Sequence, residues 1–197
     1  MIAEDQTMVR QALAALLELE PDIHVVAEAA SGDEAIAMAR KHQPDVAVLD
    51  IEMPGPSGIE VARQLEASGF AGKIVIVTTF GRPGYLRAAM AAGASGFLLK
   101  DAPAAQLAAA IRRVAAGERV VDAALAAAAL TEGESPLTER ETEVLAVAAG
   151  HESITEIAGR LHLSPGTVRN HLSAAIGKLG ARNRADAARI AREKGWL

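Results

Sequence analysis

Polar side chains that could carry out phosphoryl chemistry stand at the ends of hydrophobic runs. Asp50 follows the run 46–49 and precedes the proline- and glycine-rich stretch 53–58, which is typical of a turn. A carboxylate is a competent nucleophile toward phosphorus, provided that a cation offsets the repulsion between the two anions. Glu4, Asp5 and Asp50 could together hold Mg²⁺, which takes a few carboxylates along with water and phosphate oxygens. The sequence therefore predicts an aspartyl phosphate and a Mg²⁺ site.

Two further polar residues end later hydrophobic runs. Thr78 follows the run 74–77, and Lys100 follows the run 97–99. The Lys100 ammonium could contact a transferred phosphoryl group as a point charge, and the Thr78 hydroxyl could donate a hydrogen bond to it. Taken singly, each has an ordinary explanation, because threonine favours strands and lysine is usually solvated. Their joint placement at successive strand ends favours a site.

Short apolar runs alternate with longer segments of helical periodicity. The expected strands are residues 1–3, 24–27, 46–49, 74–77 and 97–99. The expected helices are residues 8–19, 32–41, 58–67, 83–92 and 103–116. This alternation predicts an α/β fold, a flavodoxin-like doubly wound sheet of five parallel strands covered on both faces. Such sheets bind ligands at the carboxyl ends of their strands.

The first expected strand is short. Only three residues precede Glu4, whereas strands usually run to about five or six residues. We expect the natural start to lie a few residues upstream. A shortened strand would lose hydrogen bonds to its neighbours in the sheet, and this loss could misplace Glu4 and Asp5.

The alternation of apolar runs and helical segments ends near residue 117. Residues 118–135 begin alanine-rich and end in a polar, glycine-containing stretch that is typical of a linker. We therefore expect one domain at residues 1–117, a linker at 118–135 and a second domain at 136–197. Four helix starts with recognisable caps follow the linker, at Thr138 with Glu141, Ser153 with Glu156, Ser164 with Pro165, and Asn183. They predict an all-α domain of four short helices.

Composition excludes several classes of protein. The chain has no cysteine, so it has no disulfide and no thiolate zinc site, and no His-Glu-x-x-His spacing is present. The longest uncharged apolar stretch, residues 88–99, has 12 residues, short of the roughly 20 that a membrane-spanning helix needs. The acidic start is unlike a signal peptide. We expect a cytoplasmic protein without membrane insertion.

The net charge of −5 is divided unevenly along the chain. Residues 1–135 carry 11 basic and 18 acidic residues, a net −7, whereas residues 136–197 carry 9 and 7, a net +2. Between Arg160 and Lys194 there are 8 basic and 2 acidic residues. A basic C-terminal segment predicts contact with a polyanion.

Residues 153–179 have the pattern of a helix-turn-helix, with a turn at 162–164. On the second helix the apolar residues share one face, which is predicted to face the core: Val168, Leu172, Ala175, Ile176 and Leu179. The polar face, including Arg169, Asn170 and Ser173, could enter a major groove. Arginine and asparagine are the side chains that read guanine and adenine. The candidates for phosphate contacts are Thr167, Lys178, Arg182 and Arg184.

The spacing of the strand-end residues resembles the receiver domain of two-component response regulators. It runs 46 residues from Glu4 to Asp50, 28 from Asp50 to Thr78 and 22 from Thr78 to Lys100. The resemblance implies that a sensor histidine kinase phosphorylates Asp50, and that Thr78 and Lys100 bind the phosphoryl group.

The same resemblance implies a metal site and a switch residue. Mg²⁺ would be held by Glu4, Asp5, Asp50 and the backbone carbonyl of Glu52. Phe97, three residues before Lys100, matches the aromatic residue that moves on activation in the family, although a core phenylalanine is an equally good explanation.

The C-terminal segment resembles the LuxR-type DNA-binding domain. The matching residues are Leu137, Thr138, Arg140, Glu141, Glu143, Val144, Leu145, Glu156, Ile157, Ala158, Leu163, Ser164, Thr167, Val168, Arg169, His171, Lys178, Leu179 and Gly180. A receiver followed by this domain resembles the NarL/FixJ-type response regulators over the whole chain. The resemblance implies a transcription factor that dimerises on phosphorylation and binds paired DNA half-sites. Residues 78–85 and 193–197 look most like regulators of the DesR kind.

Three alternatives remain open. A phosphatase of the haloacid-dehalogenase kind would use Asp50 as nucleophile but needs a second aspartate where this chain has Glu52. A flavodoxin-like nucleotide binder would need a Ser/Thr/Gly-rich loop where this chain has Asp5-Gln6-Thr7. A phosphorylation-independent receiver would result if the short first strand misplaced Glu4 and Asp5. We expect a regulator and not an enzyme.

Overall fold

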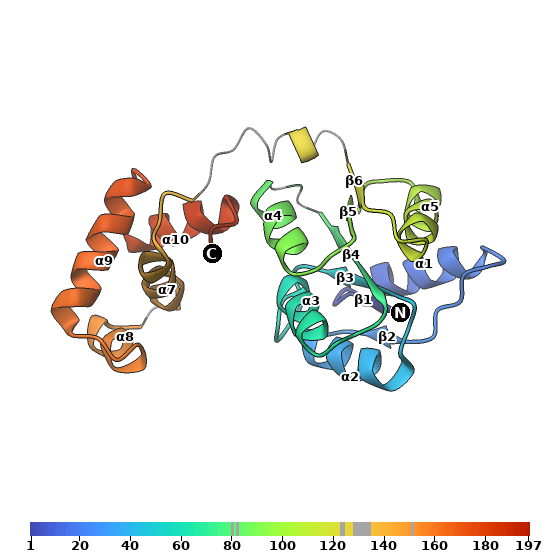
Figure 1. Ribbon diagram of the computed structural model, residues 1–197, viewed down its shortest axis with the longest axis horizontal. Coiled ribbons are helices and arrows are strands. Elements are labelled where there is room, and N and C mark those ends of the chain that lie inside the picture. The colour runs from blue at the N-terminus through green and yellow to red at the C-terminus, as the bar shows by residue number, and fades with distance from the viewer. Residues whose placement is uncertain (80, 82, 123–124, 128–134, 151) are drawn as a thin grey trace. The chain divides into compact units, whose positions relative to one another are not determined.

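Six parallel strands form the sheet of the N-terminal part of the chain, in the order β2-β1-β3-β4-β5-β6. They are β1 (Ile2–Ala3), β2 (Glu28–Ala29), β3 (Val46–Asp50), β4 (Lys73–Thr78), β5 (Gly96–Leu99) and β6 (Val120–Val121). The computed structural model describes all residues except 80, 82, 123–124, 128–134 and 151 (Figure 1). The chain divides into two compact units, Met1–Gly81 with Leu86–Ala127, and Arg82–Tyr85 with Ala128–Leu197.

The sheet has one strand more than the five expected. Val120 and Val121 pair in parallel with Gly96 and Phe97 of β5. They lie in the stretch that the sequence suggested to be linker, where two β-branched residues alone were too short a signal. Gly117, with φ of +91°, turns the chain after α5 and brings these two residues to the sheet edge.

The second strand is also displaced from its expected position. It was predicted at residues 24–27 but is formed by Glu28–Ala29. A strand needs a partner, and β1 offers only Ile2 and Ala3, which pair with Glu28 and Ala29. The β-branched run before β2 therefore stays outside the ladder.

The helices described between the strands are α1 (Thr7–Glu18), α2 (Gly32–His42), α3 (Gly58–Ala67), α4 (Pro83–Ala91) and α5 (Ala104–Ala115). All lie in the first unit except the start of α4, up to Tyr85, which is grouped with the second. Alternate strand residues, such as Val48, Val75 and Leu98, pack against Leu17 of α1 and Ile111 of α5. Helices α2 and α3 contact each other and lie on the other side of the sheet (Figure 1). The predicted doubly wound arrangement is therefore confirmed.

The second unit contains the four predicted helices: α7 (Glu139–Ala148), α8 (Ile154–Arg160), α9 (Pro165–Lys178) and α10 (Arg184–Glu193). Each begins at a predicted cap, where a side-chain oxygen of Thr138, Ser153, Ser164 or Asn183 accepts a hydrogen bond from a backbone N–H of the first turn. Such caps satisfy N–H groups that have no partner within the helix. The polar part of the expected linker falls mostly on residues 128–134, which lie outside the described residues.

Candidate functional site

The strand order places the reactive side chains at one point of the sheet. Chain connections run in opposite directions from β1 and β3, which are neighbours. At such a switch point the loops diverge and leave a crevice at the carboxyl ends of the strands. Glu4 and Asp5 follow β1, and Asp50 is the last residue of β3.

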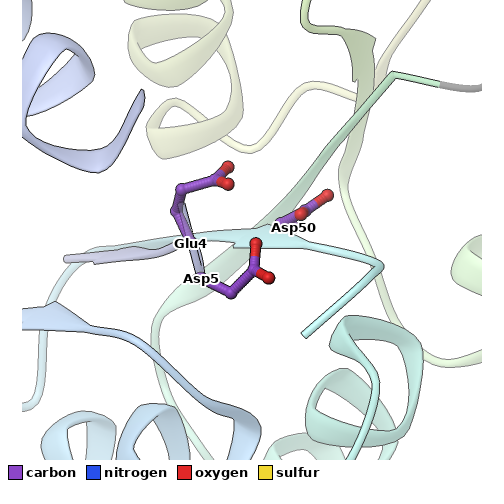
Figure 2. A group of neighbouring side chains, drawn as sticks. All are labelled: Glu4, Asp5 and Asp50. Atoms are coloured by element: carbon purple, nitrogen blue, oxygen red, sulfur yellow. The ribbon is translucent and has the colours of Figure 1, made fainter. Parts of the chain in front are cut away.

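Three carboxylates converge there (Figure 2). Glu4, Asp5 and Asp50 each present an oxygen, and these oxygens all lie within 4.8 Å of one another. Glu4 and Asp50 are buried, whereas Asp5 is exposed. Carboxylate oxygens are hard donors of the kind that Mg²⁺ takes in proteins, and the ion usually retains several waters, for which an exposed carboxylate leaves access. The donor set therefore fits the predicted cation.

Lys100 binds two of these carboxylates. Its Nζ lies 2.6 Å from Oε2 of Glu4 and 2.9 Å from Oδ2 of Asp50. Burial raises the pKa of the Glu4 carboxyl, although the hydrogen bond from Lys100 opposes that shift. Burial also acts to lower the pKa of Lys100, but its hydrogen bonds to Glu4 and Asp50 outweigh burial, so that this pKa is raised. Lys100 therefore stays charged beside Asp50.

The backbone around Asp50 fixes its carboxylate. The N–H of Ile51 donates to Oδ1 of Asp50 over 2.8 Å, and the N–H of Gly58 donates to the carbonyl oxygen of Ile51 over 3.1 Å. A Cβ atom added at Gly58 would lie 1.9 Å from the carbonyl oxygen of Asp50. Only glycine lets the start of α3 approach the end of β3 so closely.

The remaining receiver candidates lie on β4, on β5 and in the turn after β3. Thr78, the last residue of β4, is buried, and its carbonyl oxygen accepts a hydrogen bond from the N–H of Lys100 over 2.8 Å. Phe97 is fully buried within β5, between Ile76 and Val121 in the ladder. Glu52 lies in the turn after β3 with its side chain exposed.

Sequence reasoning missed Arg10 at this site. Its Nη1 donates to the carbonyl oxygen of Glu4 over 2.6 Å, so the guanidinium holds the loop that carries Glu4 and Asp5. Its place in α1 gave no signal, because a single arginine in a helix is usually solvated. The contact depends on how the helix folds back against the end of β1.

The polar face of α9 is open to solvent. Arg169, Asn170 and Ser173 are exposed, whereas Val168 and Leu172 are buried in the core of the second unit. The predicted division of the helix into a core face and a polar face is confirmed. His162, with φ of +53°, makes the turn between α8 and α9.

The candidates for phosphate contacts make bonds within the second unit. Lys178 Nζ lies 2.7 Å from Oε2 of Glu141, a buried residue of α7. Arg184 donates to the carbonyl oxygen of Glu152 over 2.7 Å, and Arg182 lies 3.2 Å from Asp186 with its side chain 84% exposed. Sequence reasoning missed Glu141 as the partner of Lys178, because the two residues are far apart in the chain. Thr167 shares a hydrogen bond of 2.8 Å with Ser164.

An α/β sheet with a group of carboxylates at its switch point, followed by a helix-turn-helix unit, defines a class of proteins that join a regulatory domain to a DNA-binding domain. The family described as response regulator receiver domain matches residues 1–112, and the family described as bacterial regulatory proteins, luxR family, matches residues 135–191. The chain belongs to the NarL-type response regulators, which are DNA-binding transcription regulators.

The chain resembles its relatives over its full length. It is 48% identical over 196 residues to the uncharacterized transcriptional regulatory protein YvfU of Bacillus subtilis, covering 100% of this chain and 98% of that protein. It is 46% identical over 196 residues to the transcriptional regulatory protein DesR of the same organism, covering 100% and 97%. The crystal structure of ChrA, the response regulator of a heme-sensing two-component system, matches with a TM-score of 0.59 and 34% identity, covering 100% and 97%.

Every helix among the described residues is too short or too polar to cross a membrane.

Proposed function

We propose that this response regulator is switched on when a sensor histidine kinase transfers a phosphoryl group to Asp50. An Asp50 carboxylate oxygen forms a bond to phosphorus as the bond between phosphorus and the kinase histidine breaks. The observation that carries this proposal is the position of Lys100, within hydrogen-bond distance of Asp50 and of the neighbouring Glu4. A fixed cation beside the nucleophile offsets the negative charge that arrives with the phosphoryl group.

A Mg²⁺ held by Glu4, Asp5, Asp50 and the backbone carbonyl of Glu52 would supply further positive charge to the phosphoryl oxygens. Support comes from the three converging carboxylates. Three carboxylates and the one ammonium of Lys100 leave two negative charges, which a divalent cation would offset.

The change of conformation follows from the charge that phosphorylation adds to Asp50. A phosphoryl group brings about −1.5 to −2 charge and three acceptor oxygens. Lys100 and the Thr78 hydroxyl move to bind it. Movement of Thr78 at the end of β4 frees space toward which Phe97 of the neighbouring strand β5 turns, and the surface around these strands is remodelled.

The output is sequence-specific DNA binding by α9 in a major groove. Arg169 reads guanine, Asn170 reads adenine and Ser173 lies on the same exposed face. Thr167, Lys178, Arg182 and Arg184 would contact phosphates. Support comes from the exposure of the polar face and from the excess of basic residues between Arg160 and Lys194.

Phosphorylation promotes a homodimer that reads paired half-sites, since two-fold protein symmetry matches a palindromic site. A surface suited to a second copy is the outer side of α1. Met8 is 83% exposed, Leu16 is 44% exposed and Leu19, which follows the helix, is 78% exposed. The exposure of these three side chains supports α1 and the residue after it as the surface.

We further propose that the chain acts in the cytoplasm, with a receiver at 1–117, a linker at 118–135 and a DNA-binding domain at 136–197. Asp50 serves a regulatory switch and is not the nucleophile of a phosphatase. A phosphatase would release phosphate from organic phosphates over many turnovers, and this chain is expected to retain one phosphate for each molecule.

The test is the intact mass of the full chain after incubation with Mg²⁺ and acetyl phosphate. The wild type is expected to gain one phosphate, with acetate leaving, and Asp50→Asn is expected to gain none. A phosphate on Asp50→Asn, or none on the wild type, would overturn the assignment. The size of the oligomer, measured in the same samples, tests dimer formation.

A further inference from the structure

Arg10 joins three parts of the first unit, namely α1, the loop after β1 and strand β2. Its Nη1 donates to the carbonyl oxygens of Glu4 and Asp5, over 2.6 Å and 3.5 Å. Its Nε lies 3.5 Å from Oε2 of Glu28, the first residue of β2, and only 14% of the Arg10 side chain is exposed. The guanidinium therefore ties α1 to the loop after β1 and to the neighbouring strand.

The loop that Arg10 holds lies between a very short strand and the start of α1. Strand β1 contributes two residues to the ladder, and beyond it the N–H of Glu4 donates to the carbonyl oxygen of Ala29 over 3.0 Å. Gln6, the N-cap residue of α1, forms no capping hydrogen bond through its side chain with any described residue. Its N–H instead donates to Oε1 of Glu4 over 3.2 Å. Lys100 and the N–H of Gln6 hold the two carboxylate oxygens of Glu4, whereas Asp5 is exposed. The bonds of Arg10 to the main chain therefore bear most on the direction of the Asp5 side chain.

We propose that Arg10 is a positioning residue for the cation site. By fixing the main-chain carbonyls of Glu4 and Asp5, it fixes the directions in which their carboxylates leave the backbone. Ligands that are ordered before the cation arrives lose less conformational entropy on binding it, so affinity rises. This inference rests on the proposed Mg²⁺ site, and its test separates the two.

Two effects of Arg10 on the cation have opposite signs. As a positive charge near the crevice, Arg10 repels Mg²⁺, so that removing its charge would tighten binding if only Coulomb forces acted. As a positioning residue it pre-organises the ligands, so that its removal weakens binding. The direction of the change therefore shows which role dominates.

The experiment measures the Mg²⁺ dissociation constant of the full chain by isothermal titration calorimetry, with Mg²⁺ alone and no phosphodonor. Arg10→Met is expected to weaken Mg²⁺ binding about tenfold, since outer residues that orient metal ligands typically contribute 10- to 100-fold. Arg10→Lys keeps the charge but lacks the planar fork of the guanidinium, so it is expected to weaken binding as well. Arg63→Met, an exposed position on α3, is the control and is expected to bind as the wild type does.

A second readout separates positioning from a merely structural role. The Mg²⁺ concentration that gives half the maximal rate of phosphorylation by acetyl phosphate is expected to rise in both Arg10 variants, with the maximal rate held within about twofold. The melting temperature without Mg²⁺ identifies a variant that has lost its fold. If Arg10→Met does not fold, the Mg²⁺ affinity of Arg10→Lys tests the positioning role instead.

Tighter Mg²⁺ binding in Arg10→Met, or unchanged binding in both variants while the wild type binds, would overturn the role of Arg10 alone. A lower maximal rate with unchanged half-saturation would also overturn it, because that result describes a structural residue. Absence of Mg²⁺ binding by the wild type would instead overturn the proposed cation site itself.

Discussion

The ammonium of Lys100 lies 2.9 Å from Oδ2 of Asp50, so the proposed phosphoacceptor is already paired with a cation. The same ammonium lies 2.6 Å from Glu4, which is 1% exposed. One lysine therefore separates two buried carboxylates that would otherwise repel each other. Its loss should affect both the stability of the first unit and its chemistry.

Lys100→Met is expected to lower the free energy of unfolding by about 3 kcal/mol, because removing one partner of a buried ion pair leaves an uncompensated charge. Mg²⁺ should restore part of the loss by replacing the missing positive charge. Urea unfolding followed by circular dichroism, with and without Mg²⁺, measures both effects. Lys73→Met, at an exposed lysine that begins β4, is the control. Equal losses in the two variants would contradict the role given to Lys100.

Gly58→Ala is expected to lower the free energy of unfolding by at least about 2 kcal/mol, since its Cβ cannot be accommodated without moving backbone. That Cβ would lie 1.9 Å from the carbonyl oxygen of Asp50, so Asp50 must shift and its phosphorylation should slow. Thermal unfolding and the intact-mass assay measure the two changes. Gly159→Ala is the matched control, because a Cβ there meets nothing within 4 Å. In helix α8 it should stabilise the chain by about 0.5–1 kcal/mol, and a neutral Gly58→Ala would refute the close approach.

The stability of the second unit should depend on acidic pH through Glu141. The hydrogen bond from Lys178, followed by the one from the backbone of Thr138, lowers the pKa of the Glu141 carboxyl below its ordinary value of 4.5. A carboxyl with a lowered pKa stabilises the fold at pH above its unfolded pKa and loses this contribution as the pH falls through the folded pKa. Stability should therefore fall below about pH 4.5.

Lys178→Met should weaken this dependence and lower stability near neutral pH by about 1–3 kcal/mol, because Glu141 keeps its burial but loses a charged partner. Trp196, the one tryptophan of the chain, packs against the core of the second unit, so its fluorescence reports this unit. Urea unfolding between pH 3.5 and 7, followed by that fluorescence, gives the pH profile. Identical profiles for wild type and variant would show that the Lys178–Glu141 pair contributes nothing.

Alanine substitutions at Arg169 and at Arg182 are expected to change DNA binding in different ways. Arg169→Ala should cost about 1–3 kcal/mol and relax the preference for one base, as the loss of a base contact does. Arg182→Ala should weaken binding to all sequences alike and reduce the dependence of log K on log salt by about one. Fluorescence anisotropy on matched and single-base-changed duplexes over a range of salt concentrations separates the two. Swapped behaviour would mean that the base contact and the phosphate contact are assigned to the wrong residues.

Local signals accounted for most of the fold. Each helix of the second unit starts at a residue whose side chain can cap it, and a cap depends only on residues three positions apart, as with Thr138 and Glu141. Asp50 and Lys100 could be placed at strand ends because a hydrophobic run stops at each. The sequence therefore predicted the acidic group and the polar face of α9 by residue number.

Contacts between segments that are far apart in the chain could not be predicted from the sequence. The second strand was predicted at residues 24–27 but lies at Glu28–Ala29, because its position depends on which residues β1 can pair with. Strand β6 likewise depends on its pairing with the edge of β5. The contacts of Arg10 with Glu4 and of Lys178 with Glu141 likewise join segments that meet only after folding. None of these features leaves a periodic or spaced pattern in the chain.

Control of DNA binding by phosphorylation of Asp50 is tested most directly by the dissociation constant for a duplex selected from random sequence by the wild-type chain. The constant is measured at one salt concentration, before and after treatment with acetyl phosphate and Mg²⁺, for wild type and Asp50→Asn. Phosphorylated wild type should bind at least about tenfold more tightly, which corresponds to about 1.4 kcal/mol, and Asp50→Asn should not respond. Equal affinity of phosphorylated and unphosphorylated wild type, with the added phosphate verified by mass, would contradict control by Asp50.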